Sequence, residues 1–237
     1  VSEALKQQTY DLIDTKAPID TLYNFVDENV FKPVDPGDLK QQFGIKDDEK
    51  VIIHISNFRK IKNLPDIVDS FMKIRAKMPV KLLLVGDGPE KHRVMEQVKA
   101  SPYKKDVLFL GKQENITELF AISDLKLLLS EKESFGLVLL EAMACAVPGI
   151  GTNIGGIPEV IEHGKNGYIV ELGDTQAVAD YAVQLLQDEE KLAAFSAAAL
   201  NAVSDNFHEH KIIKQYEDLY ERVVAKKNDS KAMAGRN

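Results

Sequence analysis

Cysteine is nearly absent from this 237-residue sequence, occurring once as Cys145, and this excludes an internal disulfide framework. Acidic residues outnumber basic ones and give a net charge of −7, so the electropositive surface of a nucleic-acid-binding protein is not expected. No hydrophobic run approaches the ~18 residues of a membrane span, and no signal-peptide pattern opens the chain. The sequence therefore predicts a cytoplasmic protein with neither a nucleic-acid partner nor a membrane span.

Several motifs of catalytic and metal sites are also missing. No two aspartates are separated by a single residue, which removes the Asp-x-Asp metal clasp, and no Gly-x-x-x-x-Gly-Lys-Ser/Thr motif is present for ATP hydrolysis of the P-loop kind. His208 and His210 are two positions apart, and no cysteine cluster accompanies them, so zinc binding is not predicted. Cys145 follows an Ala- and Met-rich stretch, where a buried inert thiol is favoured over a nucleophile.

Short apolar segments alternate with amphipathic ones along most of the chain, and 44% hydrophobic residues are ample for a core. This alternation predicts an α/β fold, a Rossmann-like doubly wound parallel sheet. Strands are expected at 51–55, 81–85, 107–110, 125–129, 148–151 and 168–170, with a further strand at 19–25. Helices are expected near 3–13, 38–43, 63–77, 89–100, 118–122, 136–145, 158–160, 175–186, 189–203 and 210–224. The polar tail at 227–237 is predicted to be disordered.

The segment at 124–145 is the most informative part of the sequence. A buried strand ends there in a polar loop, and a helix follows, so the loop lies where open α/β sheets bind ligands. The unpaired amides of residues 135–138 at the helix start are predicted to favour an anion such as a phosphate group. Glu133 and Glu141 bracket this turn, and each carboxylate could accept both hydroxyls of a vicinal diol. Two glutamates at this spacing are also common on helices without any site.

Two other loops carry weaker signals. Arg59, Lys60 and Lys62 follow the first buried strand and could meet a diphosphate, although a solvated basic turn explains them as well. Gly86 and Gly88 follow the next strand, but the third glycine of a dinucleotide fingerprint is missing, and a tight turn is the simpler explanation.

Four motifs in order resemble the donor-binding half of the retaining glycosyltransferases of family 4, which have the GT-B fold. They are Tyr-Asn-Phe-Val-Asp at 23–27, Gly-Asp-Gly-Pro at 86–89, Glu-Ser-Phe-Gly at 133–136 with Glu-Ala-Met-Ala at 141–144, and Gly-Gly-Ile-Pro-Glu-Val-Ile at 155–161. The likeness covers nearly the whole chain, up to about residue 224. It implies that residues 1–226 are the C-terminal, nucleotide-sugar-binding domain of a GT-B enzyme, with a helix and linker at 1–18. The N-terminal GT-B domain, which holds the acceptor, would then be missing, and the chain alone would be inactive.

The resemblance also implies roles for single residues. Arg59 and Lys62 would grip the donor phosphates, although Ser56 and Asn57 stand where the common family pattern has Gly-Arg, and Arg59 comes two positions late. Glu133 would bind the donor sugar, and Glu141 the ribose. No metal ion or other cofactor is implied. The remaining donor-binding candidates, most of them acting through backbone groups, are Phe135, Gly136, Leu137, Val138, Gly88, Gly111, Lys112 and Gln113.

The amino-acid sequences of residues 54–63 and 123–145 resemble one subgroup of the family more specifically. This resemblance implies UDP-GlcNAc as the donor, a malate-like acceptor and a place in bacillithiol biosynthesis. Two alternatives remain open: a nucleotide-sugar-binding module without catalysis of its own, and a GT-B nucleotide-sugar epimerase, which needs no acceptor.

Overall fold

Six parallel strands form the centre of the protein. They are β1 (Lys50–Ile55), β2 (Val80–Val85), β3 (Val107–Gly111), β4 (Leu125–Leu128), β5 (Gly149–Thr152) and β6 (Gly167–Val170). Their order across the sheet is β3-β2-β1-β4-β5-β6, and every neighbouring pair is parallel. The computed structural model describes the backbone of residues 1–234 and the side chains of residues 1–225. The predicted doubly wound α/β sheet is confirmed.

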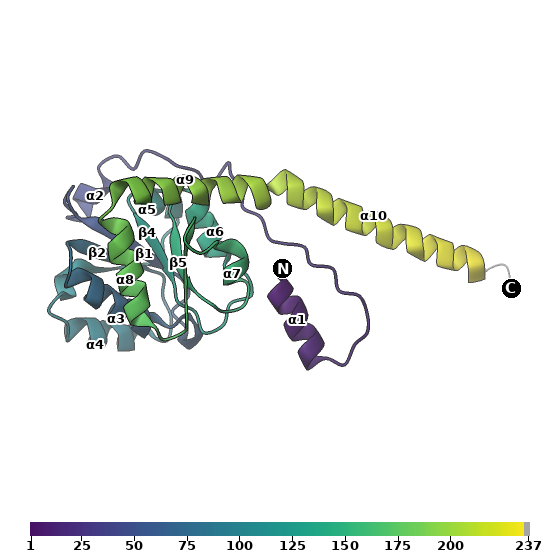
Figure 1. Ribbon diagram of the computed structural model, residues 1–237, viewed down its shortest axis with the longest axis horizontal. Helices are drawn as coiled ribbons and strands as arrows, with labels where there is room; N and C mark the ends of the chain where they lie inside the picture. Colours follow the sequence, from purple (N-terminus) through teal and green to yellow (C-terminus); the bar gives the residue numbers. More distant parts are fainter. Residues whose placement is uncertain (235–237) are drawn as a thin grey trace.

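Helices cover both faces of the sheet (Figure 1). On one face α3 (Leu64–Arg75), α4 (Lys91–Lys99) and α8 (Thr175–Leu186) pack in a single hydrophobic cluster with the strands. On the other face α5 (Ile116–Ala121), α6 (Leu137–Ala144) and α7 (Ile157–Val160) form two further clusters. The strands are buried on both sides, which explains their nearly continuous apolar sequences. The remaining helical segments are α1 (Glu3–Leu12), α2 (Leu39–Gln42), η1 (Lys60–Lys62), η2 (Lys104–Asp106), α9 (Glu189–Asn206) and α10 (Glu209–Ala234).

Two predictions at the ends of the chain differ from the structure. Residues 19–25 form no strand, because only Val26 makes a bridge, to His208, and an extended segment without a neighbouring strand has no ladder to join. The tail is helical up to Ala234, since α10 simply continues through a stretch with good helix formers. The last three residues of the predicted disordered tail lie outside the described residues.

The strand order places a crevice at the carboxyl ends of β1 and β4. Chain connections leave β1 towards β2 on one side and leave β4 towards β5 on the other, and ligands bind at such a switch point in open α/β sheets. The loops after both strands, 56–63 and 129–136, flank this crevice. The loop after β4, which carries the strongest sequence signal, and the basic loop after β1 are therefore neighbours in space.

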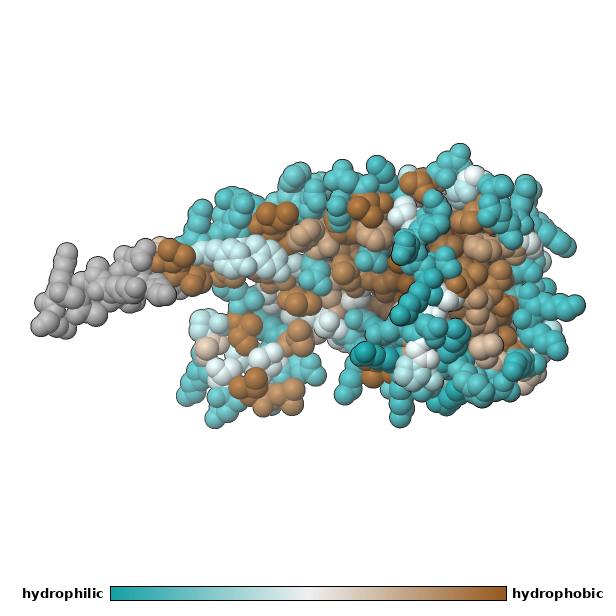
Figure 2. All heavy atoms as spheres, turned by 180° about the vertical axis from the view of Figure 1, so that it is seen from behind, coloured by the Kyte–Doolittle hydropathy of each residue, from teal (hydrophilic) through white to brown (hydrophobic). Residues whose placement is uncertain are grey.

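Helices α1 and α10 project from the body of the protein on the same side (Figure 1). Hydrophobic residues lie at the surface of both, as Figure 2 shows from behind. On α10 Tyr220, Val223 and Val224 are more than half exposed, and at the end of α1 Leu12 and Ile13 are as well. These elements contribute little to the main core.

Candidate functional site

The centre of the candidate site is an ion pair between the two loops that flank the crevice. Lys62, at the end of η1, lies with its Nζ 2.6 Å from Oε2 of Glu133, which follows β4. Both side chains are largely buried, at 17% and 13% exposure, so solvent screens the pair less than a surface pair. Because an ammonium group has three donors, Lys62 can bind Glu133 and an anion at the same time. The two residues predicted to touch the donor phosphates and the sugar are thus brought together.

The start of α6 presents unpaired amides to the same crevice. Gly136 caps the helix with a φ of +95° and supplies no capping side chain. Within the described residues, neither the amide of Leu137 nor that of Val138 has a hydrogen-bond acceptor. This agrees with the predicted anion site, which needs free donors and the positive end of a helix dipole. The Phe135 ring is buried against Tyr23 and Phe207, so only the backbone of Phe135 is available to a ligand.

Glu141 lies in the second turn of α6 and is half-buried. Burial raises the pKa of its carboxyl group to about 7, and the charge of Lys126 opposes this rise. The described residues offer its carboxylate no hydrogen-bond donor and no ion pair within 4.0 Å. Glu141 therefore does not point into bulk solvent, and its oxygens remain free to accept hydroxyl groups.

Close backbone packing fixes the loops around the site. A Cβ at Gly155, whose φ is +55°, would lie 1.7 Å from the carbonyl oxygen of Glu133. A Cβ at Gly88 would lie 2.7 Å from the carbonyl oxygen of Phe58. Gly155 therefore holds the Glu133 loop in place, and Gly88 positions the basic loop after β1.

The other predicted donor-binding residues lie at the same edge of the sheet but further out. The Gly111 carbonyl accepts a hydrogen bond from Gly86 N at 2.7 Å, which joins the loops after β2 and β3. Lys112 and Gln113 are exposed at the end of β3, the outermost strand on this side. Arg59 is also exposed, and its side chain forms no ion pair with Glu133. These four residues lie outside the Lys62–Glu133 pair that forms the centre of the site.

A cleft of about 760 Å³ opens over the ion pair. One wall is α1, and the other consists of the loops at 61–62, 131–134 and 154–155. Helix α1 is tied to these loops: Ser2 Oγ donates to Ser134 O at 2.6 Å, and both oxygens of Glu159 accept amides of α1, from Glu3 and Ala4, at 2.9 Å. The cleft is large enough for a drug-sized ligand.

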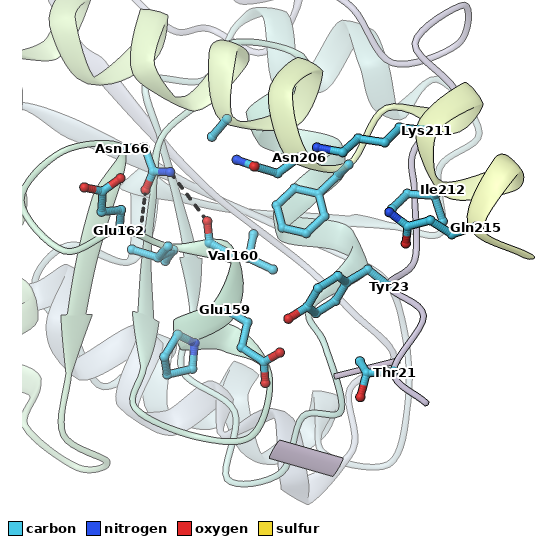
Figure 3. Close-up of a pocket in the computed structure, with 14 residues that line it drawn as sticks. Thr21, Tyr23, Glu159, Val160, Glu162, Asn166, Asn206, Lys211, Ile212 and Gln215 are labelled. Atoms are coloured by element: carbon cyan, nitrogen blue, oxygen red, sulfur yellow. Dashed lines mark hydrogen bonds between the residues drawn. The ribbon is translucent and has the colours of Figure 1, made fainter. Parts of the chain in front are cut away.

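A second hollow, of about 530 Å³, lies between α7, the segment around Tyr23 and the junction of α9 with α10. Figure 3 shows the Tyr23 hydroxyl pointing towards Glu159, with Thr21 beside it. Burial, followed by the Glu159 carboxylate, raises the pKa of Tyr23 to about 12. None of the predicted site residues lines this hollow, so it is separate from the crevice.

The described residues contain no group of three or more His, Cys, Asp or Glu side chains placed to hold a metal ion. No helix within the same part of the chain is both long and apolar enough to cross a membrane.

The comparisons with known proteins agree with this geometry. A family model described as "Glycosyl transferases group 1" matches residues 36–202, which is more than half of the chain. This chain belongs to the group 1 glycosyltransferases. As a member of that family it carries one half of the GT-B architecture.

The chain is similar to curated relatives and to several solved structures. It is 53% identical to N-acetyl-alpha-D-glucosaminyl L-malate synthase of Bacillus anthracis over 94% of this chain and 59% of that protein. The structure of HepE from Anabaena, in complex with UDP and glucose, is 29% identical, with a TM-score of 0.78 over 85% of this chain and 56% of that one. The C-terminal domain of a group 1 glycosyl transferase from Francisella tularensis is 26% identical, with a TM-score of 0.71 over 78% of this chain and 99% of that one. The chain thus spans about three fifths of the curated relative.

Sequence reasoning missed two residues of this glycosyltransferase. Lys126 lies on β4 with an exposure of 0%, yet the sequence analysis gave it no role. A charge inside an apolar strand was the available signal. Glu159 on α7 accepts hydrogen bonds from two amides of α1, and the available signal was its place in the motif at 155–161, in which this residue was given no role.

Proposed function

We propose that this chain is the donor-binding domain of a retaining glycosyltransferase that uses UDP-GlcNAc and, in the whole protein, transfers GlcNAc to L-malate. The observation that carries the proposal is the Lys62–Glu133 pair beside the unpaired amides of α6, at the switch point of the sheet. The name of the Bacillus anthracis relative and the UDP of the HepE complex support the choice of substrates. We infer a role in bacillithiol biosynthesis from the same likeness.

Each part of the site has a task that suits its chemistry. The diphosphate rests on the amides of Leu137 and Val138 and takes the remaining donors of Lys62, with Arg59 approaching from the rim. Glu141 accepts the two ribose hydroxyls, and Glu133 accepts hydroxyls of the donor sugar. Loop residues Gly88, Gly111, Lys112 and Gln113 lie on the side where the base would extend.

The reaction breaks the bond between the anomeric carbon and the diphosphate oxygen, and the electron pair of this bond leaves with UDP. A new bond joins the anomeric carbon to the hydroxyl oxygen of the acceptor, whose proton passes to the departing diphosphate. Negative charge then grows on the diphosphate while the sugar becomes oxocarbenium-like. Fixed cations and amides that face the leaving group stabilise this charge without having to reorganise. We propose that the site needs neither a metal ion nor a protein general base for this step.

The rest of the enzyme is proposed to be a second α/β domain that holds the acceptor. The curated relative is longer than this chain, which spans 59% of it. Helices α1 and α10 project on one side with exposed apolar side chains, and this side suits contact with another domain (Figure 1). Helix α1 also forms one wall of the cleft, so the second domain would lie next to the bound donor.

Isothermal titration with UDP and then UDP-GlcNAc tests the donor site. The wild-type chain is expected to bind both. Glu141→Ala should lower the affinity for both ligands by about 10-fold or more, because it removes charged hydrogen bonds worth about 1.5–3 kcal/mol. Glu133→Ala should spare UDP, since it leaves Lys62 free for the phosphates, and weaken only the extra affinity for UDP-GlcNAc.

Glu162→Ala is the matched control, because Glu162 is an exposed glutamate that is paired only with Lys165. It should bind both ligands like the wild type. Equal and unchanged affinities in Glu141→Ala and Glu133→Ala would contradict the assigned roles. Failure of the wild-type chain to bind UDP would contradict the proposed function itself.

Two alternatives remain from the sequence. A non-catalytic binding module would bind UDP-GlcNAc equally well, and an epimerase would convert the sugar without an acceptor. The first alternative is separated from a transferase by assay of the longer protein with malate, and the second by incubation of the longer protein with UDP-GlcNAc alone. The name of the 53% identical relative favours the transferase.

A further inference from the structure

Lys126 is a fully buried lysine that the mechanism above leaves without a task. Its neighbours across the sheet are Ile53 on β1 and Gly149 on β5, and its side chain lies on the face that α6 covers. Gly149 allows this cover to be close, because a Cβ there would lie 2.2 Å from Leu139 of α6. The Nζ of Lys126 is buried and has no hydrogen-bond partner in the described part of the chain. An unpaired ammonium at such a place costs several kcal/mol, so its presence calls for a reason.

The charged and titratable groups around Lys126 come from four elements. Glu141 on α6 and Glu133 in the loop after β4 favour its ammonium form, whereas Lys62 in η1 and burial oppose it, and the pKa of Lys126 falls to about 7. His54 on β1 is neutral, because burial holds its pKa well below the usual value. Cys145 on α6 is neutral too, because burial and then Glu141 raise its pKa to about 12.

Glu141 is an acidic group that has to stay ionised although it is half-buried. To accept two ribose hydroxyls it must be a carboxylate, since a protonated carboxyl group keeps one oxygen as a donor. Burial under the ligand would make that carboxylate still less stable, unless an opposite charge compensates for the lost solvent. The Lys126 side chain is the group whose charge acts most directly on Glu141.

We propose that Lys126 is a positioning residue of the donor site, whose buried ammonium group is the counter-charge that keeps Glu141 a carboxylate able to accept both ribose hydroxyls. This inference rests on the proposed function, because it assumes that a nucleotide ribose reaches Glu141. It explains why a lysine stands in an otherwise apolar strand directly beneath α6.

The inference predicts opposite proton exchange in two forms of the protein. Just above neutral pH the free wild-type chain holds Lys126 partly uncharged, and a bound diphosphate with an ionised Glu141 favours the ammonium, so UDP binding takes up a proton. In Lys126→Met no counter-charge remains, so the pKa of Glu141 rises further and its carboxyl group is partly protonated. UDP binding to that variant must therefore release a proton.

Titration calorimetry of the full chain with UDP measures this directly. Titrations at pH 8 in two buffers of different ionisation enthalpy give the number and sign of the protons exchanged, and UDP itself is fully ionised there. At pH 7 Lys126→Met is expected to lower the affinity for UDP by about 10-fold, the effect of one pKa unit. At pH 9 the loss of affinity should be smaller, because Glu141 ionises there without Lys126. In a Glu141→Gln background the same change should have little further effect, because no carboxylate remains to be held.

Lys81→Met is the matched control, since Lys81 is a buried strand lysine that pairs with Glu49 and Asp106 away from the site. It should keep the wild-type sign of proton exchange. Lys126→Gln, which removes the charge but keeps a polar group, repeats the test if the methionine variant does not fold.

The inference is overturned if the wild-type chain binds UDP while Lys126→Met keeps its affinity and its sign of proton exchange. A wild-type chain that binds no UDP would instead overturn the proposed function, and the inference would fall with it.

Discussion

At the scale of single residues, buried charge determines the chemistry of this site. Lys62 and Glu133 neutralise each other at 2.6 Å, whereas Lys126 and Glu141 have opposite charges without an ion pair between them. His54 stays neutral and links two segments, because its Nδ1 lies 3.0 Å from Leu127 O and its Nε2 lies 2.8 Å from Ser56 Oγ. A neutral ring that donates from Nδ1 must accept at Nε2, so Ser56 donates to it. This contact helps to hold the basic loop at the end of β1.

Replacement of Lys126 by Met should stabilise the fold at neutral pH. The pKa of Lys126 is about 7 in the fold and near its ordinary 10.5 in the unfolded chain, so the unfolded chain binds more protons between these values. The lysine therefore costs most at pH 7 and below, and its cost fades towards pH 10. Urea unfolding should show a gain of about 1–4 kcal/mol for Lys126→Met at pH 7, by analogy with other buried charges replaced by apolar groups.

The gain should be smaller at pH 9.5, because Lys126 is then largely uncharged in the folded wild-type chain and most of its cost has faded. Lys81→Met, which breaks two ion pairs, should lower the unfolding free energy instead. A loss of stability in Lys126→Met at pH 7 would show that Lys126 has a partner that stabilises the native state.

At the scale of elements, the site is built by loops that touch through their backbones. The Gly155 loop packs on the Glu133 loop, and the loop of Gly86 and Gly88 packs on residues 56–58. Three hydrogen bonds join α1 to this part of the molecule, one to Ser134 in the Glu133 loop and two to Glu159 on α7. Side chains of the site therefore keep their positions because the glycines leave no space between the loops.

Gly155→Ala tests this packing against a glycine of similar conformation. Gly173 has a φ of +85° and nothing within 4 Å of a Cβ, so Gly173→Ala should cost only the strain of a left-handed residue, about 1–2 kcal/mol. Gly155→Ala adds a clash with the Glu133 carbonyl, which should cost a further ~1–3 kcal/mol in chemical unfolding. Gly155→Ala should also lower the affinity for UDP-GlcNAc more than the affinity for UDP. Equal unfolding free energies of Gly155→Ala and Gly173→Ala would contradict the packing argument.

At the scale of the whole molecule, one α/β domain carries two helices that extend beyond its core. Helix α10 has exposed apolar residues, such as Tyr220 and Val223, which the described part of this domain leaves uncovered (Figure 2). The sheet places all the predicted donor groups at one edge, with no second sheet opposite them in the described residues. The architecture accounts for donor binding more fully than for transfer.

Transfer to malate by this chain alone should accordingly be negligible. Incubation with UDP-GlcNAc and L-malate, followed by measurement of released UDP and of the glycosylated product, tests this expectation. The longer relative of Bacillus anthracis, assayed in parallel, is the positive control. Measurable turnover by the 237-residue chain would contradict the proposal that the acceptor domain is essential.

The α/β class and all six strands of the sheet, each to within one residue at both ends, could be predicted from the sequence, and so could the candidate residues of the loops that flank the crevice. Hydrophobic alternation and glycine turns are local properties, so they can be read without knowledge of the fold. The family likeness implied a role for Lys62 and a role for Glu133. It did not predict that these two residues, 71 positions apart, form an ion pair. The strand predicted at 19–25 failed because a strand needs a partner that the local sequence does not show.

Only the tertiary structure decided what Lys126, Glu141 and Glu159 face. Strand order and register place Lys126 between β1 and β5, and the packing of α6 then removes it from water beside Glu141. Both groups titrate near pH 7 because of that burial, and burial is a property of the assembled layers rather than of any segment. For this reason the sequence indicated which residues are candidates for donor binding, and the fold determined how their charges are balanced.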